Sequence, residues 1–326
     1  MHAIRLHEFG PAENLRYEEV PDPVPAAGQV RIAVEASGVH LLDTVLRAGP
    51  GSGGPPAVPS LPVIPGREVA GTVDLVADGV DGAWLGRRVV AHLGAAGAGY
   101  ARLAVAPVSA LHVVPDGLDL AAAVAMIGTG RTAVGVLDVA APTADDVVLV
   151  TASAGGLGSL FVQAGRNAGA VVVAVAGGAE KVDRVRGLGA SIVADYTAAD
   201  WPERVTSLLG GREVTVVLDG VGGGSGRAAM DLLGVGGRLV MFGWSSGELL
   251  PFTSSDLVDR GLTATWAVGR RLAARPGALR ELETRSLAAA ADGELVPLVQ
   301  RLPLERAAAA HAALESRRSF GKVVLV

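Results

Sequence analysis

The feature that most constrains the fold is a repeated order of apolar run, turn and helix-like segment in the second half of the chain. The run DVVLVTA (146–152) is followed by a glycine turn, by a segment with helical spacing (157–169), and by the apolar run AVVVAVA (170–176). Runs that are apolar on both faces are typical of a parallel sheet covered by helices on each side. The alternation continues through RLVMFG (238–243), so residues 121–266 are predicted to form a doubly wound α/β domain.

The first 120 residues have a different pattern. QVRIAVEASGV (29–39), EVAGTVDLVA (68–77) and RRVVAHL (87–93) are short runs rich in β-branched residues, separated by Gly, Pro and Asp. They predict a β-rich domain. Residues 47–66 are so rich in Pro and Gly that we expect a long loop at the edge of a pocket.

Beyond residue 266 the alternation fades. Helices are expected over 270–292 and 305–316, followed by a terminal strand in FGKVVLV (320–326). The parallel sheet is already built from consecutive elements, so we expect this strand to return to the first domain. The predicted domains are therefore 1–120 plus 267–326, and 121–266.

Composition narrows the function classes. The chain has 326 residues, half of them hydrophobic, and a formal net charge of −5 without a long basic run, so nucleic-acid binding is not expected. Cysteine is absent, which removes disulfides, thiolate nucleophiles and Cys-ligated zinc. No stretch approaches the ~20 apolar residues of a membrane span, and no signal peptide is recognisable. We expect a soluble, cytoplasmic protein that does not bind membranes.

The glycine turn reads SAGGLG, with a serine at the first position of the G-x-G-x-x-G fingerprint. Such a turn must bend sharply, let the backbone approach a pyrophosphate, and pack the helix tightly on the strand. Its place between two apolar strands predicts a dinucleotide site, although a glycine turn packed for steric reasons alone remains the alternative. The residues assigned to it are Ser153, Gly155, Gly156, Leu157 and Gly158.

The end of the second apolar strand indicates which dinucleotide binds. NAD-specific folds place an acid there for the ribose 2′-hydroxyl, whereas this chain has Gly177. Lys181 supplies charge for a 2′-phosphate, and Tyr196 follows the next strand. These three residues favour NADPH over NADH. The alternatives are a solvated lysine and a tyrosine that merely caps the sheet.

Several phrases in order extend this interpretation, among them ASGVHLLDTVLRAG (36–49), IPGREVAG (64–71), VPDGLDLAAAVAMIGTGRTA (114–133), VVLDGVGG (216–223) and LVMFG (239–243). Together they resemble the medium-chain dehydrogenase/reductase superfamily, and within it the zinc-independent quinone oxidoreductases related to ζ-crystallin. The resemblance implies a GroES-like first domain, a Rossmann second domain, a cofactor in the cleft between them, and a homodimer built through the edges of the Rossmann sheets.

A catalytic zinc is not expected. Such a site needs three protein ligands, typically Cys and His. The zinc-dependent alcohol dehydrogenases of the superfamily carry a Cys in the segment matching 38–43 and a His in the segment matching 66–68, where this chain has no Cys and Arg67. His40, Asp43, Glu68 and His92 remain as an unconvincing alternative ligand set. Without a Lewis acid, simple alcohol oxidation is disfavoured.

Chemistry without a metal directs attention to hydrogen-bond donors. His40 stands where quinone reductases of this branch have Asn, and Thr129 lies in the segment that the resemblance places beneath the nicotinamide; both are candidate catalytic residues. A packed histidine bonded to backbone is the alternative for His40. The candidate substrate-pocket residues are Asp43, Tyr100 and Trp266, with a structural turn, the domain core and ordinary packing as their respective alternatives.

Further cofactor contacts are expected after the fourth and fifth strands, because cofactors lie outside the carboxyl ends of parallel strands. These residues are Val221, Gly222, Phe242, Gly243, Trp244 and Ser245. Core or interface packing is the alternative for Trp244. Arg131 is expected to pair with either a phosphate or a protein acid, and Arg317 or Lys322 to approach the 2′-phosphate.

The leading hypothesis is an NADPH-dependent reductase of quinones, with a small electrophilic acceptor as its partner. The alternative within enzymes is a reductase of enals, enones or enoyl thioesters. A third possibility, of another class, is a non-catalytic NADPH-binding structural or sensor protein.

Overall fold

The computed structural model describes residues 1–50 and 59–326, and these fall into two compact units. The first unit comprises Met1–Thr129 and Pro297–Val326, and the second comprises Gly130–Val296. The predicted loop over 47–66 begins later than expected, because Arg47 and Ala48 still belong to helix α1 (Leu41–Ala48). Residues 51–58 of that loop lie outside the described part.

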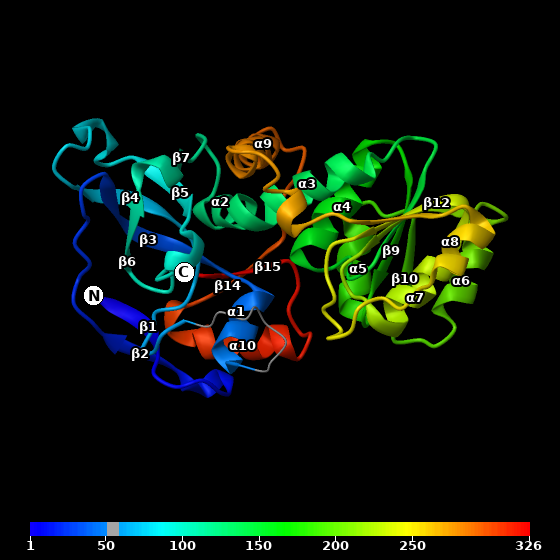
Figure 1. The fold of residues 1–326 in the computed structure, drawn as a ribbon, viewed down its shortest axis with the longest axis horizontal. Coiled ribbons are helices and arrows are strands. Elements are labelled where there is room, and N and C mark those ends of the chain that lie inside the picture. The colour runs from blue at the N-terminus through cyan, green and yellow to red at the C-terminus, as the bar shows by residue number, and fades with distance from the viewer. Residues whose placement is uncertain (51–58) are drawn as a thin grey trace. The chain divides into compact units, whose positions relative to one another are not determined.

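The first unit is built around a seven-stranded mixed sheet (Figure 1). Its longest strand is β3 (Gln29–Val39), which pairs with β4 (Glu68–Val76) along one edge. Along its other edge β3 pairs first with β6 (Leu103–Pro107) and then with β15 (Lys322–Leu325). The C-terminal strand therefore returns to the first unit, as predicted.

The remaining strands and helices complete this unit. The sheet continues through β5 (Arg88–His92) and β7 (Leu111–Val113) on one side and β14 (Val299–Leu302) on the other. A separate two-stranded sheet joins β1 (His2–Leu6) and β2 (Leu15–Glu19). Helix α10 (Ala307–Glu315) packs against α1.

The second unit is a six-stranded parallel sheet in the order β10-β9-β8-β11-β12-β13. The chain leaves β8 in one direction to build β9 and β10 and then returns to β11 beside β8, which is the topology of a doubly wound fold. The strands are β8 (Val147–Val150), β9 (Val171–Ala176), β10 (Ile192–Asp195), β11 (Val214–Asp219), β12 (Leu233–Met241) and β13 (Thr263–Trp266).

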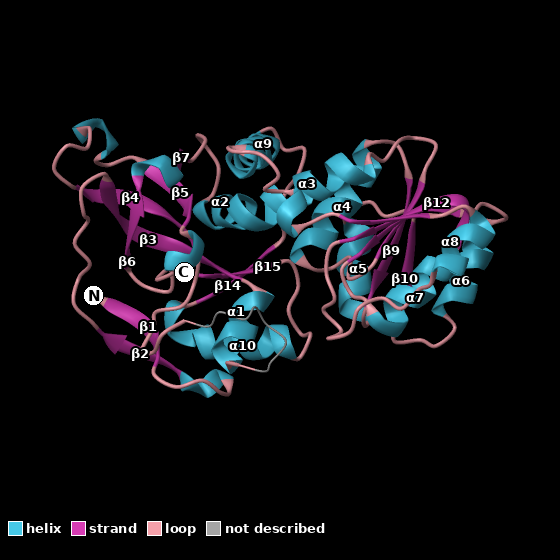
Figure 2. Ribbon diagram, viewed as in Figure 1, coloured by secondary structure: helices cyan, strands magenta, loops and turns pink. Residues whose placement is uncertain are grey.

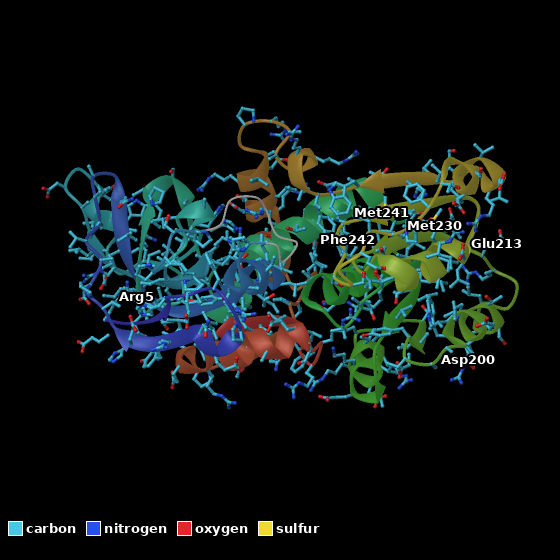
Figure 3. The ribbon with its side chains drawn as sticks, turned by 60° about the horizontal axis from the view of Figure 1, so that its bottom comes forward. Arg5, Asp200, Glu213, Met230, Met241 and Phe242 are labelled. Carbon is cyan, nitrogen blue, oxygen red and sulfur yellow. The ribbon has the colours of Figure 1, made fainter. Side chains whose placement is uncertain are left out.

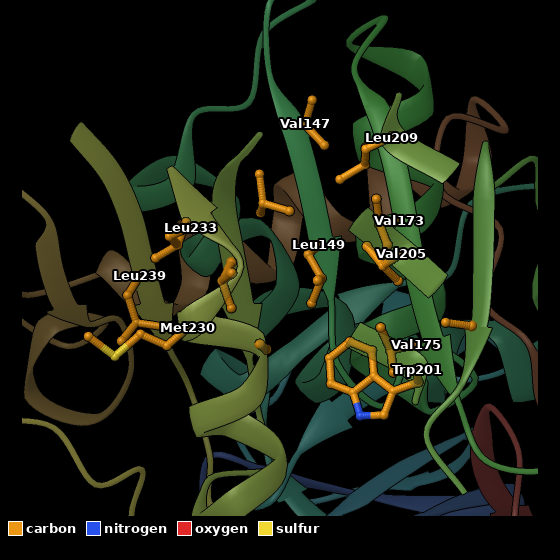
Figure 4. Packing of buried hydrophobic residues seen from close by; sticks show 14 of the residues in the cluster. Val147, Leu149, Val173, Val175, Trp201, Val205, Leu209, Met230, Leu233 and Leu239 are labelled. Carbon is orange, nitrogen blue, oxygen red and sulfur yellow. The ribbon is translucent and has the colours of Figure 1, made fainter. Parts of the chain in front are cut away.

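Helices cover both faces of this sheet (Figure 2). On one face, α6 (Trp201–Leu209), α7 (Gly223–Asp231) and α8 (Ser254–Arg260) bury side chains against the strands. Figure 4 shows this cluster, with Trp201 lying below Val175. The remaining helices of the unit are α3 (Arg131–Ala140), α4 (Gly156–Asn167), α5 (Ala179–Gly187) and α9 (Ala278–Ala291).

Three expectations need adjustment here. The helix expected over 270–292 begins only at Ala278, because Pro276 and Gly277 (φ 78°) interrupt it. This helix packs on α3, so residues 267–296 lie in the second unit and not in the first, where we expected them. Contrary to our expectation that no stretch approaches the length of a membrane span, one apolar helical run in the described part of the chain, Leu120–Ala140, is long enough to cross a membrane. This run is a core helix, since 72% of its apolar window is buried.

Candidate functional site

The glycine turn joins the carboxyl end of β8 to the first turn of α4. Ala152 takes a positive φ of 46° at the bend, whereas Ser153 has no positive φ, so the position of the missing first glycine does not require glycine. The Ser153 N–H donates to the carbonyl of Val175 on β9 (3.0 Å), and the Gly155 N–H donates to Ala152 (2.9 Å). Two short hydrogen bonds therefore fix the turn beneath the N-terminus of a twelve-residue helix.

The turn meets the demands of a pyrophosphate cradle. A Cβ at Gly158 would overlap the carbonyl oxygen of Ala152 and approach Ser153 Cα to 2.6 Å, so the helix packs on the turn only with glycine there. The first N–H groups of α4 have no intrahelical acceptor and favour an anion. Ser153 itself is fully buried and its Oγ has no hydrogen-bond partner among the described residues, so its hydroxyl does not face outward. The backbone, with Gly155, Gly156 and Leu157, is what the turn offers a phosphate.

The structure brings Gly177 and Tyr196 together. They follow β9 and β10, where Asp195 pairs with Ala176, and the Tyr196 N–H donates to Ala176 (3.0 Å). A Cβ at Gly177 would lie 2.5 Å from the Tyr196 hydroxyl oxygen, so the tyrosine ring packs directly over the glycine. Lys181 lies in the first turn of α5, half-buried. In Rossmann folds this edge of the sheet binds a ribose of the cofactor. Here it carries the phenol of Tyr196 packed on Gly177, and β9 has no acid at its end.

Sequence reasoning missed a carboxylate at this edge. Asp195 ends β10, and its Oδ1 accepts hydrogen bonds from the Gly178 N–H (3.0 Å), the Thr197 N–H (2.9 Å) and the Thr197 hydroxyl (2.7 Å). These bonds, led by the one from Gly178, lower the pKa of Asp195 below its usual value. The sequence Asp195-Tyr196-Thr197 at the end of the third strand could have indicated this carboxylate, because an Asp at a strand end often bonds the backbone two residues later in an Asx turn.

A second missed carboxylate shapes the turn after β11. Asp219 is fully buried and accepts from the Thr151 hydroxyl (2.8 Å), the Val221 N–H (3.1 Å) and the Gly222 N–H (3.0 Å). It therefore fixes both predicted contact residues of this turn. Gly222 has φ 69°, a conformation that favours glycine.

The turn after β12 lies against the turn after β11. The Phe242 N–H donates to the backbone carbonyl of Asp219 (2.8 Å), and the Ser245 N–H donates to the carbonyl of Gly220 (3.1 Å). A Cβ at Gly243 would approach the Gly220 carbonyl oxygen to 2.9 Å. The Phe242 ring meets Phe161 of α4 edge-on with ring centroids 5.0 Å apart. Figure 3 labels Met241 and Phe242 at this end of the strand.

Trp244 and Trp266 form a pair of indoles. Their ring centroids are 5.3 Å apart and their planes are inclined by 33°. Trp244 is 44% exposed and Trp266 is 38% exposed, so neither is a core residue. They follow or end adjacent strands of the parallel sheet, and Trp266 pairs with Met241 in the register of β12 and β13.

In the first unit, His40 and Lys322 share one buried carboxylate. Glu68 begins β4 and has no exposed surface. Its Oε1 lies 2.6 Å from Nε2 of His40, and its Oε2 lies 2.9 Å from Nζ of Lys322 on β15. Burial raises the pKa of Glu68, but His40 and Lys322 outweigh it and hold the pKa well below its usual range. The carboxylate is therefore ionised and lies between His40 and Lys322.

Two glycines make room for this carboxylate. A Cβ at Gly38 or at Gly128 would overlap the Glu68 side chain. Gly128 also lies against the His40 ring, since its Cβ position is 3.5 Å from His40 Cε1. Thr129 follows Gly128 in the helical turn Met126–Gly130, so the two predicted catalytic residues lie on segments that meet at Glu68.

Asp43 also positions His40, through the backbone N–H group of His40 at the start of α1. Its Oδ2 accepts from the His40 N–H (2.9 Å) in a capping box that starts α1, and from the hydroxyl of Tyr100 (2.9 Å). Tyr100 is fully buried in the hydrophobic core of the first unit, and its oxygen also lies 3.2 Å from Nε2 of His311. Asp43 and Tyr100 thus hold the start of α1 from the interior, as their structural alternatives predicted, and do not line an open pocket.

Burial sets the ionisation of this second group. Desolvation, reinforced by the Asp43 carboxylate, raises the pKa of Tyr100 well above its usual value of 10.0. Desolvation likewise lowers the pKa of His311 to about 4, so its imidazole is neutral at neutral pH. The Tyr100–Asp43 hydrogen bond therefore has a phenol as donor and a carboxylate as acceptor.

The structure locates four basic residues and shows whether the alternative metal ligands form a group. Arg131 pairs with a protein acid, Glu283 of α9 (2.8 Å), which resolves its two expected roles. Lys322 is committed to Glu68 and is nearly buried, which overturns its expected approach to a phosphate. Arg317 takes φ 56° in the turn after α10, and Arg67 Nε lies 3.7 Å from the Asp43 carboxylate. In residues 1–50 and 59–326, no three His, Asp or Glu side chains form a group that could hold a metal ion.

Comparison with known proteins agrees with this architecture. Residues 26–116 match the family model described as alcohol dehydrogenase GroES-like domain, and residues 156–284 match the one described as zinc-binding dehydrogenase. A quinone oxidoreductase of Salmonella typhimurium is 31% identical over 345 aligned positions, covering 99% of this chain and 98% of that protein. A 2-haloacrylate reductase of a Burkholderia species is 32% identical over 337 positions, with the same coverage of both.

Solved structures give the same answer. The quinone oxidoreductase of Escherichia coli in complex with NADPH superimposes with a TM-score of 0.86 at 30% identity over the whole of both chains. A mycobacterial protein, also solved with NADPH, gives a TM-score of 0.85 at 33% identity over the whole of both chains. The chain therefore belongs to the medium-chain dehydrogenase/reductase superfamily and is an oxidoreductase similar to its quinone oxidoreductases.

Proposed function

We propose that this protein is an NADPH-dependent oxidoreductase that reduces quinones by hydride transfer without a metal ion. Full-length similarity to quinone oxidoreductases supports the reaction class. The residue chemistry supports the absence of a metal, because the chain has no cysteine and the oxygens of Glu68 are both engaged by cations of the chain itself.

The observation that carries the proposal is the edge formed by the carboxyl ends of β8, β9 and β10. A glycine turn under a helix N-terminus stands beside a strand end that has Gly177 under Tyr196. The turn suits a pyrophosphate, and an acid-free strand end with Lys181 close in sequence suits a 2′-phosphate. Relatives solved with NADPH point the same way.

NADPH supplies the hydride when bound, and the chain's own residues bind, orient and protonate. A quinone is already electrophilic, so orientation and hydrogen bonding contribute most to its reduction. We assign hydrogen bonding of the acceptor oxygen to His40 and Thr129. Nε2 of His40 lies 2.6 Å from Glu68, so we assign the contact with the acceptor oxygen to Nδ1. With the hydride that NADPH would supply, one proton passed to the acceptor oxygen would complete the reduction of the quinone to the hydroquinone.

A second function is reduction of an activated carbon–carbon double bond in an enal, enone or enoyl thioester. The observation that favours it is the 32% identity to a 2-haloacrylate reductase over the full length. Both functions use the same hydride donor and differ in the acceptor pocket.

The assembly is part of the same proposal. β13 is an edge strand of the parallel sheet. We propose a cytoplasmic homodimer that pairs these edges, which size-exclusion chromatography with light scattering tests directly.

The deciding experiment follows the loss of NADPH absorbance with a panel of quinones and enones, before and after chelator treatment. We expect turnover with quinones, preference for NADPH over NADH, and no effect of the chelator. Binding of NADPH without reduction of any acceptor would favour a non-catalytic NADPH-binding protein. Chelator-sensitive activity would refute the metal-free mechanism.

A further inference from the structure

The pair of indoles at the end of the parallel sheet is not part of the hydrophobic core of the second unit. The chain contains only four tryptophans and twelve aromatic residues of Phe, Trp and Tyr type in total. Trp201 is buried in the core of the second unit, whereas Trp244 and Trp266 are 44% and 38% exposed and lie against each other. Exposed aromatic side chains that gather in one place mark binding sites more often than they mark stability.

Both indoles are fixed by their backbones. Trp266 is the last residue of β13 in register with Met241, and the next N–H, of Ala267, donates to Met241 (2.9 Å). The residues after Trp244 are tied to the neighbouring turn, since the N–H groups of Ser245 and Ser246 donate to Gly220 (3.1 Å) and Val221 (2.9 Å). A pair held in this way loses little conformational entropy when a ring stacks on it.

The position of the Trp244–Trp266 pair indicates which kind of ligand it can contact. It follows β12 and β13 at the carboxyl edge of the sheet, where ligands of doubly wound folds lie. Trp244 Cβ is 3.2 Å from the Cβ position of Gly222, so the pair borders the turn after β11, which is among the predicted cofactor contacts. A flat ligand ring that reaches this border meets the exposed surface of the indole pair.

Indoles are electron-rich, and a quinone ring is electron-poor and flat, so the two stack favourably face to face. An acyclic enone or a haloacrylate presents no ring face and gains little from the same surface. We propose that Trp244 and Trp266 together form a stacking platform for the ring of a cyclic conjugated acceptor, and that the platform favours ring quinones over acyclic double-bond substrates. This inference rests on the proposed reductase function and names the substrate class of that site.

The test compares menadione, a naphthoquinone, with methyl vinyl ketone, an acyclic enone, in the full-length protein with NADPH. Trp244→Leu and Trp266→Leu are each expected to lower kcat/KM for menadione roughly 3- to 10-fold, the range of an aromatic pair contact. The loss in kcat/KM for methyl vinyl ketone is expected to be clearly smaller than the loss for menadione, and the Kd for NADPH is measured for each variant so that a change in cofactor binding is separated from a change in acceptor binding. Trp244→Phe keeps a ring and is expected to retain most of the preference.

Phe252→Leu is the matched control, because Phe252 is exposed to a similar extent (36%) and is outside the pair. A binding measurement without turnover accompanies the kinetics: quenching of tryptophan fluorescence by menadione, which the Leu variants should weaken. Circular dichroism melts establish that each variant is folded.

Several outcomes would overturn the platform. Equal losses for both acceptors would mean general damage, and a weaker Kd for NADPH with unchanged acceptor kinetics would assign the pair to the nicotinamide. A change of oligomeric state would assign it to a second copy of the chain. A wild-type protein that reduces neither acceptor would instead refute the proposed function itself.

Discussion

Nε2 of His40 lies 2.6 Å from Oε1 of Glu68, a carboxylate with no exposed surface. The half-buried imidazole is thereby held through the interior, by a group that Lys322 also contacts at 2.9 Å. Glu68 and Lys322 are therefore positioning residues for His40 in the proposed reaction.

Breaking the contacts of Glu68 with His40 and Lys322 is expected to destabilise the first unit strongly. Glu68→Gln leaves the ammonium of Lys322 buried without a counter-charge, and Lys322→Met removes one of two cations from Glu68. Each should lower the free energy of unfolding by about 3–5 kcal/mol, measured by urea denaturation. Because the pKa of Glu68 is held below its usual value of 4.5, the stabilisation is complete at neutral pH and is lost progressively as the pH falls below 4.5.

The control for these variants is Arg301→Ala. Arg301 of β14 pairs with Asp119 at 2.6 Å, but both side chains are about half exposed, so its loss should cost less than about 1 kcal/mol. Equal losses in the buried and the exposed pair would contradict the role of burial.

The buried His311 predicts that the free energy of unfolding also depends on pH between about 4 and 6.5. Its folded-state pKa is about 4 and its usual value is 6.5, so between these values the unfolded chain binds a proton that the folded chain does not. The free energy of unfolding should therefore fall as the pH is lowered from 6.5 to 4, by about 3 kcal/mol in all. His311→Phe should flatten this slope, whereas the exposed substitution His7→Gln should leave it unchanged. An unaltered slope in His311→Phe would assign the dependence to other groups.

Cofactor choice can be tested at the Gly177–Tyr196 edge. Lys181→Ala and Tyr196→Ala should raise the Kd of NADPH about tenfold and that of NADH by less than about twofold, if they contact the 2′-phosphate. Arg186→Ala on the same helix, where the arginine pairs with Asp183 at 2.7 Å, is the control. Equal losses for both cofactors would refute the assignment.

For Asp195 we expect the opposite effect, a tighter binding of NADPH when its charge is removed. Its carboxylate at this edge repels a 2′-phosphate, and Asn retains the Oδ1 acceptor for Gly178 and Thr197. Asp195→Asn should therefore tighten NADPH severalfold relative to NADH, measured by fluorescence titration of both cofactors. A shift toward NADH would show that Asp195 binds a ribose hydroxyl instead.

Gly158→Ala tests the pyrophosphate turn. The added methyl group overlaps the backbone of Ala152, so α4 must move away from the turn, and the Kd of NADPH should rise more than roughly tenfold. Gly187→Ala, where no atom lies within 4 Å of the Cβ position, is the matched control. Unchanged binding in Gly158→Ala, checked by calorimetry, would remove the turn from the cofactor site.

The sequence predicted those parts of the fold that repeat a simple pattern. Apolar runs that alternate with helical segments identified the parallel sheet, and the final run was placed correctly in the other unit. The boundary of α9 was available in Pro276 and Gly277, but the segment's assignment to the second unit depends on its packing against α3, which no local pattern reports.

The geometry of the turn could be predicted where backbone sterics decide it, whereas contacts between side chains distant in the sequence could not. Gly158 follows from the steric demands of the turn. Glu68 and Lys322 are separated by more than two hundred positions, and only strand pairing of β15 and β4 on either side of β3 brings them together. Asp195 and Asp219 were missed because a strand-end acid that bonds its own turn looks like any other polar residue in a loop.

The order in which the two units can form during synthesis follows from the pairing of β15 with β3. Gly130–Val296 is continuous, whereas the first unit needs Pro297–Val326 as well as Met1–Thr129. The unit translated first is therefore completed last, against the usual N-terminal-first order of domain folding. Until Lys322–Leu325 has been made, Ser37–Val39 presents a strand edge that another chain can pair with, and Glu68 lacks its lysine.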